Sequence, residues 1–306
     1  MNSQPILSLC IPTNGAVKWV LPVLDSIYKQ NYNLSKYEVV ITDNGKDSKL
    51  ASYLKDYNYA NLRYIQTNDE GFLNLVTSLK KGRGLFCKMI NHRSILVDGA
   101  IEKMVMLVEQ YKENQPIIYC SSGQINKPEI VECKNVDELV QNLSYWCSWS
   151  AGIGFWQKDI EQIEKVELDK MFPNTSLLLN LRFDSQYVIW NYPYQIMEDD
   201  EGKGGYDLFD TFGVKLLDIL NELRIQERIS IDTFILVKEE LFGFLKYLFF
   251  KEVTLPTKHT FIIHNIKKSM AVYYGANHYW EMLIGAKIRK PVHLFLSAFK
   301  ALFRKK

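Results

Sequence analysis

The sequence predicts an α/β protein with a mostly parallel sheet, on three observations. Over residues 5–111, short apolar runs alternate with stretches whose apolar residues recur at helical intervals. Each apolar run is followed by Pro, Gly, Asn or Asp, the residues that turns favour. The spacing is that of strand–helix–strand units, which place successive strands in parallel.

Four strands and four helices are expected in this first part. In the first helix, Val17, Val20, Leu24 and Ile27 share one face, and Pro22 is tolerated near the first turn. The expected strands are 6–11, 38–42, 62–66 and 85–90, and the expected helices are 17–30, 48–57, 72–80 and 101–111.

Beyond residue 111 the pattern is less regular. A polar, Gly-rich stretch at 198–205 is the best candidate for a domain boundary, which gives domains 1–205 and 206–306. Before it we expect strands at 116–121 and 187–190, a strand pair in 125–134, a helix at 136–145, a strand and loop at 146–156 and a buried helix at 177–181. After it we expect helices at 207–223, 230–250 and 266–284.

Composition indicates a globular protein with reduced cysteines. The 306 residues are 47% hydrophobic and 24% charged, an ordinary balance for a chain with a core. The five cysteines form no CxxC pair, and three lie in apolar runs, which favours core thiols in a cytosolic protein. The N-terminus lacks the basic start of a signal peptide, and no apolar run is long enough to span a membrane.

The charge is divided unevenly along the chain. Seven of the 37 cations follow Glu281 with no anion after them, which leaves 30 cations against 35 anions before that point. From Val292 onward, Phe and Leu recur on one helical face and Lys and Arg crowd the other. Such a basic amphipathic segment favours a membrane surface, while packing on the domain is the alternative. The acidic body and the lack of a binding motif argue against nucleic acid.

The stretch 84–102 is where we expect a ligand. A buried strand ends at Ile90, a polar turn Asn91-His92-Arg93-Ser94 follows, and a helix begins after Gly99. In open α/β sheets, ligands bind in the crevice outside the carboxyl ends of the strands.

Several short motifs follow one another along the chain. They are Ile11-Pro12-Thr13, Leu24-Asp25-Ser26-Ile27 with Gln30, Val39–Gly45, Glu70-Gly71-Phe72 with Asn74, Gly84 before a strand, Gly99-Ala100, Phe172–Leu178 and Lys203–Tyr206. Taken in this order, they resemble the family 2 glycosyltransferases of the GT-A fold, in their bacterial surface-polysaccharide branch. The resemblance is specific over 5–110, looser over 145–210 and weak beyond.

The resemblance implies a nucleotide-sugar donor bound across the first half of the sheet. Asp43, with Asn44 beside it, would accept from a uracil N–H or a ribose hydroxyl; the alternative is a turn Asp that caps the next helix. Pro12, Thr13 and Asn14 would face the nucleotide, or simply end the strand. Gly71 and Asn74 would lie near it, or simply begin a helix.

The turn after the fourth strand departs from the family. Where the family carries an Asp-rich DxD motif that holds Mn²⁺ or Mg²⁺, this chain has Asn91, His92 and Arg93. Asn91 and His92 could hold a divalent ion only poorly, so we expect weak or absent metal dependence and name no metal ligand. Arg93 and Lys88 are the candidates to neutralise the diphosphate instead. The alternatives are that Arg93 is a surface turn residue, that Lys88 is a solvated strand residue and that His92 has a structural role.

The second departure concerns the catalytic base. The family places an acidic residue at the helix after the aromatic stretch, where the nearest carboxylate here is Asp169. A turn aspartate is the alternative, and Glu198, Asp199 and Asp200 are interpreted as a charged linker. On the acceptor side, Trp146 and Trp149 would stack on a sugar or pack as core.

The resemblance thus implies an inverting glycosyltransferase. Its expected donor is a nucleotide-diphosphate sugar, UDP-linked, and its expected acceptor a lipid-linked or polymeric glycan at the inner face of the bacterial membrane. The alternative is a non-catalytic docking subunit with the same fold. A nucleotidyltransferase is a third hypothesis, but Pro12–Gly15 is not the Gly-rich phosphate loop that such an enzyme needs.

Overall fold

The computed structural model of the chain describes residues 4–182, 185–197, 204–255 and 260–303, with side chains up to residue 291. By internal contacts it divides into two compact units, Met1–Asp199 and Asp200–Lys306. The expected boundary after Gly205 falls within strand β11 of the second unit. The expected linker acids Glu198, Asp199 and Asp200 lie outside the described residues.

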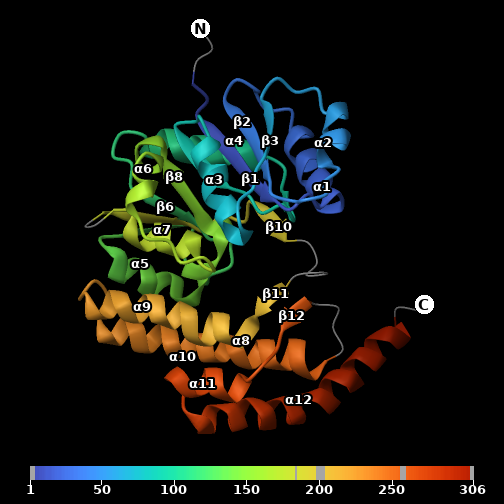
Figure 1. Ribbon diagram of the computed structural model, residues 1–306, viewed down its shortest axis with the longest axis vertical. Coiled ribbons are helices and arrows are strands. Elements are labelled where there is room, and N and C mark those ends of the chain that lie inside the picture. Colours follow the sequence, from blue (N-terminus) through green and yellow to red (C-terminus); the bar gives the residue numbers. More distant parts are fainter. Residues whose placement is uncertain (1–3, 183–184, 198–203, 256–259, 304–306) are drawn as a thin grey trace. The chain divides into compact units, whose positions relative to one another are not determined.

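The first unit alternates strands and helices (Figure 1). Its strands are β1 Leu7–Thr13, β2 Tyr37–Asp43, β3 Leu62–Gln66, β4 Phe86–Met89, β5 Ser94–Leu96, β6 Ile117–Cys120, β7 Ile130–Cys133, β8 Ile153–Trp156, β9 Tyr187–Trp190 and β10 Gln195–Met197. Its α-helices are α1 Val17–Tyr28, α2 Leu50–Tyr53, α3 Asn74–Lys81, α4 Ala100–Tyr111, α5 Val136–Leu143, α6 Gln157–Ile160 and α7 Pro173–Asn180. Its 3₁₀ turns are η1 Leu54–Asp56, η2 Gly71–Leu73, η3 Ser144–Ser148, η4 Ser150–Gly152 and η5 Ile163–Lys165.

Eight of these strands form one mixed, mostly parallel sheet in the order β3-β2-β1-β4-β8-β6-β9-β7. Strands β3, β2, β1 and β4 run parallel, and β8 is antiparallel to both of its neighbours. The α/β prediction is confirmed. The remaining two strands, β5 and β10, pair as a small antiparallel ribbon that the sequence did not predict.

Alternation along β1 explains how both faces of the sheet are covered. Leu7, Leu9 and Ile11 point into an apolar core shared with α1 and α4. Ser8 and Cys10 lie on the other face, where α3 packs against β1 (Figure 1). All five cysteines are buried and free, as the sequence predicted.

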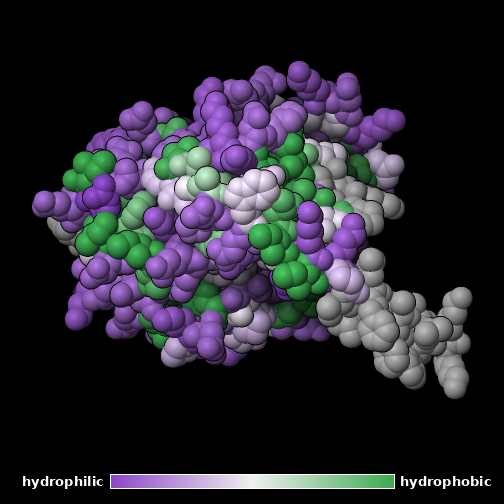
Figure 2. All heavy atoms as spheres, turned by 90° about the horizontal axis from the view of Figure 1, so that it is seen from below, coloured by the Kyte–Doolittle hydropathy of each residue, from purple (hydrophilic) through white to green (hydrophobic). Residues whose placement is uncertain are grey.

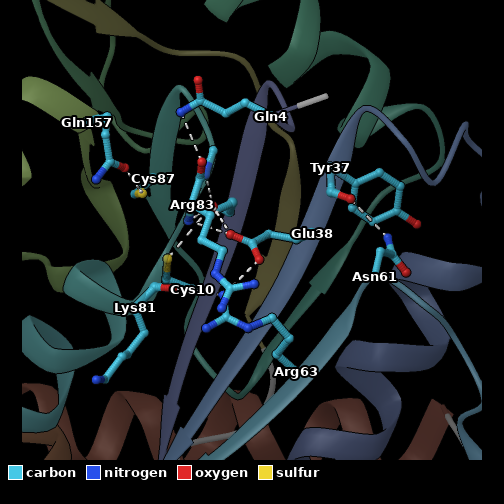
Figure 3. Close-up of polar contacts among 12 residues, drawn as sticks. Gln4, Cys10, Tyr37, Glu38, Asn61, Arg63, Lys81, Arg83, Cys87 and Gln157 are labelled. Carbon is cyan, nitrogen blue, oxygen red and sulfur yellow. Dashed lines mark hydrogen bonds and ion pairs between the residues drawn. The ribbon is translucent and has the colours of Figure 1, made fainter. Parts of the chain in front are cut away.

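A polar cluster closes the amino end of the sheet (Figure 3). The buried carboxylate of Glu38 accepts from the Ser8 hydroxyl at 2.6 Å and pairs with Arg63 at 2.9 Å. The turn before β4 passes close to this cluster. A Cβ on Gly82 would lie 2.4 Å from the Cys87 sulfur, and one on Gly84 would lie 2.7 Å from the Ser8 nitrogen. The two glycines therefore permit a close approach that a side chain would block.

The second unit is mainly helical. It contains β11 Gly204–Asp207, α8 Leu208–Asp210, η6 Thr211–Lys215, α9 Leu216–Ile225, α10 Ile231–Leu248, η7 Phe249–Thr254, β12 Thr260–Ile262, α11 Ile266–Tyr273 and α12 Ala276–Phe303. Here η6 and η7 are π-helical. Side-chain caps begin two of its helices: Asp207 accepts from the amides of α8, and Ser230 from the Thr233 amide of α10. None of the described helices is long and apolar enough to cross a bilayer.

Several expected element boundaries were wrong. The helix expected at 48–57 is only a short α2 followed by a 3₁₀ turn, and the helix expected at 177–181 begins earlier, at Pro173. The helix expected at 266–284 is two helices, because Gly275 adopts φ +78° between them. Of the strand pair expected in 125–134, only β7 is formed. The sequence also gave no sign of β11 or β12, whose pairing joins segments far apart in the chain.

Candidate functional site

The carboxyl ends of β1, β2, β3 and β4 meet at one edge of the sheet, and Asn74 joins three of the segments there. Its amide nitrogen donates to the carbonyls of Thr13 at 3.1 Å and Thr42 at 2.9 Å. Its amide oxygen accepts from the Thr67 hydroxyl at 3.1 Å. Asn74 is buried and its side chain is already hydrogen-bonded within the protein, so it organises the floor of the site.

Asp43 ends β2 and is fully buried. Its Oδ1 accepts from the Gly45 amide at 2.9 Å, and its Oδ2 accepts from the hydroxyls of Ser48 and Tyr64, the latter at 2.9 Å. Burial, followed by this bond to Asp43, raises the pKa of Tyr64 to about 12. The carboxylate that sequence analysis assigned to a base or ribose is therefore held by three protein donors, which fits the alternative of a turn aspartate.

Asn44 links the next two turns. Its side-chain nitrogen donates to the carbonyls of Asp69 at 3.0 Å and Gly71 at 3.1 Å. In this loop the Asp69 Oδ2 atom is buried and has no hydrogen-bond partner among the described residues. Burying an unpaired carboxylate oxygen costs free energy, so Asp69 is the side chain here that most needs an outside donor. The sequence does not single out Asp69, because its neighbours are those of an ordinary loop.

The turn after β1 is packed against the turn after β2. A Cβ on Gly45 would lie 2.4 Å from the Asn14 carbonyl oxygen, and Gly15 adopts φ +80°. Thr13 is buried, and its hydroxyl accepts from the Gly15 amide at 3.2 Å. Pro12 is half-buried, and Asn14 is exposed. Of the three residues expected to face a nucleotide here, Asn14 is the one whose side chain is open to one.

The turn after β4 is held next to β1. The Asn91 side-chain oxygen accepts from the Arg93 amide at 3.0 Å, and His92 Nδ1 lies 3.1 Å from the Pro12 carbonyl oxygen. The guanidinium of Arg93 stacks over the indole of Trp19, with its carbon 4.5 Å from the ring centroid. The Lys18 ammonium lies 4.6 Å from the same centroid. Two cations are thus gathered on one indole at the carboxyl edge of the sheet.

Trp19 was missed by sequence analysis. It begins α1 beside Lys18, and nothing in the local sequence connects it with a turn more than seventy residues later. The Arg93 contact with this ring exists only because α1 and the β4–β5 turn lie side by side in the fold.

The residues of this turn do not fit a divalent metal. The turn has no carboxylate, the Asn91 oxygen already accepts from a backbone amide, and one His92 nitrogen faces a carbonyl. Mg²⁺ and Mn²⁺ prefer several oxygen ligands. Across the described ranges, moreover, no three His, Cys, Asp or Glu side chains group as a metal site. No step of the chemistry is therefore assigned to a metal.

Lys88 is not where a diphosphate contact requires it. It is 1% exposed, and its ammonium donates to the carbonyls of Met89 at 2.9 Å, Ile153 at 3.1 Å and Ala151. Burial lowers the pKa of this ammonium to about 8. All three N–H donors are satisfied inside the sheet, so Lys88 is neither the phosphate ligand nor the solvated strand residue that the sequence indicated.

Asp169 shapes the start of α7. Its Oδ1 accepts from the amides of Met171 at 2.8 Å and Phe172 at 2.7 Å. Its second oxygen, Oδ2, takes no hydrogen bond from the residues that the structure describes. The next residue, Lys170, pairs with Glu70 at 3.2 Å, which brings this segment to the loop that follows β3. Asp169 therefore combines the predicted turn role with one oxygen still open to a substrate.

Trp146 and Trp149 lie in and directly after η3, in a separate part of the first unit. Their rings meet edge to face with centroids 5.9 Å apart, and both are half-buried. The Tyr119 hydroxyl donates to the Trp146 carbonyl, and Asn174 of α7 donates to the Ser148 carbonyl at 2.9 Å. The loop is thus fixed to α7, the helix that Asp169 precedes, while the expected sugar stacking stays a prediction.

The sequence matches no described protein family, and no curated protein matches it in sequence. Among solved structures, S. aureus TarS residues 1–349 in complex with UDP-GlcNAc is similar with a TM-score of 0.56 and 14% identity, over 81% of this chain and 74% of that one. The mannosyltransferase PcManGT from Pyrobaculum calidifontis, in complex with GDP-Man and Mn²⁺, is similar with a TM-score of 0.54 and 12% identity, over 96% and 84%. At such identities the likeness shows the fold alone. The fold is GT-A, as the sequence predicted.

Proposed function

We propose that this protein is a glycosyltransferase that takes a sugar from a nucleotide-diphosphate donor, UDP-linked, and delivers it to a lipid-linked or polymeric acceptor of a bacterial surface glycan. The observation that carries the proposal is the Arg93 guanidinium stacked on Trp19 at the carboxyl edge of the sheet. A planar guanidinium matches phosphate oxygens, and a diphosphate leaving group needs positive charge as it departs. The neighbours of the same fold bind UDP-GlcNAc and GDP-Man.

The proposed transfer is a direct displacement with inversion. The acceptor hydroxyl oxygen attacks the anomeric carbon, the bond from that carbon to the diphosphate oxygen breaks, and the nucleoside diphosphate leaves with the electron pair. Arg93 neutralises the charge that develops on the diphosphate. The acceptor proton passes to a carboxylate, for which Asp169 Oδ2 is our candidate. Asn14 and the buried Asp69 Oδ2 are our candidates to contact the nucleoside.

Nucleotide binding is the first test. UDP, GDP and their sugars are titrated by calorimetry into the full chain, with EDTA and separately with Mn²⁺. We expect one nucleotide to bind equally well in EDTA, because Arg93 and not a metal meets the phosphates. Binding that requires Mn²⁺ would be compatible with a transferase but would contradict the role of Arg93 as the group that meets the phosphates. No binding of any nucleotide would contradict the proposal.

Arg93→Ala is the test of the residue itself. It should weaken nucleoside diphosphate binding about tenfold or more, since charge-assisted bonds to phosphate contribute about 1.5–3 kcal/mol. It should weaken binding of the nucleoside alone much less. Arg83→Ala is the matched control, because Arg83 is an exposed arginine that lies at the amino end of the sheet, the end opposite to the proposed site (Figure 3). Equal losses in the two variants would remove Arg93 from the site.

A second candidate is a non-catalytic subunit that keeps the fold and docks to a glycan-assembly complex. Three observations favour it: the turn after β4 has no carboxylate, Asp43 is held by protein donors, and Asp169 already accepts from two backbone amides of the turn before α7. Turnover separates the two candidates. Release of UDP from a UDP-sugar in the presence of membrane-extracted acceptor supports the enzyme, whereas UDP binding without release supports the docking subunit.

The proposal includes a place for the reaction. We infer that the basic segment 292–306 contacts the inner face of the membrane, with the rest of the protein on the cytoplasmic side. Its sequence supports this, since Lys300, Arg304, Lys305 and Lys306 can meet anionic lipid, and lipid-linked acceptors lie at such a surface. The side chains of this segment lie outside those that the structure describes.

A further inference from the structure

The first half of α12 exposes a row of large apolar side chains. Trp280, Ile284 and Ile288 are 49%, 56% and 66% exposed and lie four residues apart, so they share one helical face. The opposite face is packed, since Met282 and Ala286 are buried. We call Trp280, Ile284 and Ile288 the α12 stripe. Figure 2 shows the molecule from below, where green apolar side chains lie among purple hydrophilic ones.

Cations border the α12 stripe. Lys287 and Lys290 are exposed in the same turns of the helix, and the Lys267 ammonium lies 5.8 Å from the Trp280 ring centroid. The one anion in this part of α12, Glu281, is paired with Lys246 at 2.9 Å. The helix thus presents an indole and two isoleucines with a positively charged rim, and its local acidic charge is neutralised within the protein.

We propose that the α12 stripe docks on a bilayer surface that contains anionic phospholipid, with Trp280, Ile284 and Ile288 inserted among the headgroups. A helix with an apolar stripe, an interfacial Trp and flanking lysines lies stably in that plane, where lipid phosphates meet the cations. The inference deepens the membrane contact proposed for residues 292–306, but it rests on side chains that precede that segment. In the sequence, Phe295 and Phe299 follow Ile288 by seven and eleven residues, intervals that also fit the helical period.

A second copy of the chain fits the α12 stripe less well. A stable protein interface buries about 800 Å² on each partner. A single row of three side chains offers much less surface than that. Two copies would also bring like-charged rims together, whereas an anionic bilayer complements them.

The experiment measures cosedimentation of the full chain with large unilamellar vesicles of phosphatidylcholine, with and without phosphatidylglycerol. The stripe variant is Trp280→Ser with Ile284→Ser and Ile288→Ser. Its matched control is Ile225→Ser with Ile231→Ser and Ile235→Ser, because those isoleucines are exposed to a similar degree on α9 and α10 of the same unit. We expect the stripe variant to bind phosphatidylglycerol vesicles about tenfold or more weakly, and the control to bind as the native chain does.

A third variant separates this inference from the earlier proposal. It carries Lys300→Glu, Arg304→Glu, Lys305→Glu and Lys306→Glu. If this variant loses vesicle binding while the stripe variant keeps it, the proposal that the α12 stripe docks on the bilayer is overturned, and the segment 292–306 alone makes the contact. If the native chain does not bind either vesicle, both membrane inferences fail, and the transferase proposal is still judged by nucleotide binding.

Two further readouts complete the test. Circular dichroism of the stripe variant must match the native chain, so that a loss of binding reports the surface and not unfolding. Sedimentation velocity without lipid measures self-association. A native dimer that the stripe variant converts to a monomer, without vesicle binding, would overturn the proposal in favour of a second copy of the chain.

Discussion

The buried Lys88 gives the sharpest prediction about stability. In Lys88→Met the side-chain volume is retained, but the carbonyls of Met89 and Ile153 lose a charged donor. The Ala151 carbonyl keeps a partner, since the Tyr194 hydroxyl donates to it at 3.1 Å. Losing a partner costs about 1–3 kcal/mol for each buried carbonyl. The two carbonyls together give a loss of about 2–6 kcal/mol, and removal of the buried charge returns about 3 kcal/mol at pH 7, so we expect the variant to be at most about 3 kcal/mol less stable by urea unfolding.

The same lysine predicts how that difference changes with pH. Burial lowers the pKa of Lys88 from 10.5 to about 8, which corresponds to about 3 kcal/mol of penalty on the charged form. Below pH 8 both the folded and the unfolded chain hold the proton, and the penalty is fully present. Between pH 8 and 10.5 the unfolded chain binds more protons, so the native protein gains stability as pH rises. Above 10.5 neither state holds the proton.

The comparison of the native chain with Lys88→Met isolates this effect, because the tyrosines and cysteines titrate in both proteins. Urea unfolding is followed by circular dichroism from pH 7 to pH 10. We expect the difference between the two unfolding free energies to grow in favour of the native chain, by about 2 kcal/mol or more. A difference that stays constant, or shrinks, would refute the placement of this ammonium in the sheet interior.

Three further variants test other contacts of the first unit. Asp43→Asn should cost about 1–3 kcal/mol by urea unfolding, since two hydroxyls lose a charged acceptor; a loss of nucleotide affinity at unchanged stability would instead make Asp43 a ligand contact. Glu38→Gln should cost about 2–4 kcal/mol because it leaves Arg63 without its buried partner, and a thermal midpoint equal to that of the native chain would contradict this. Gly152→Ala should lower the thermal midpoint or the folded yield, because its Cβ would lie 2.1 Å from the buried Tyr119 ring; normal stability would show that this loop can move aside.

The candidate site could be placed from the sequence only in part. Turn residues after each strand identified the edge where Asn44, Arg93 and their neighbours meet, because parallel strands bring their carboxyl ends together. What each side chain does there could not be predicted. Asp43 lies at the end of β2, as expected. Its carboxylate, however, already accepts hydrogen bonds from Ser48 and Tyr64, which lie in different parts of the chain.

The sequence by itself determined the alternation of strands and helices, the parallel first half of the sheet and the polar turn after β4, because each depends on local periodicity and turn preference. Only the tertiary structure decided the surroundings of the two candidate cations. Lys88 and Arg93 lie five residues apart, yet one is sealed among sheet carbonyls and the other stacks on Trp19 of a distant helix. Burial and long-range contacts set that difference, and neither is encoded in a short stretch of chain.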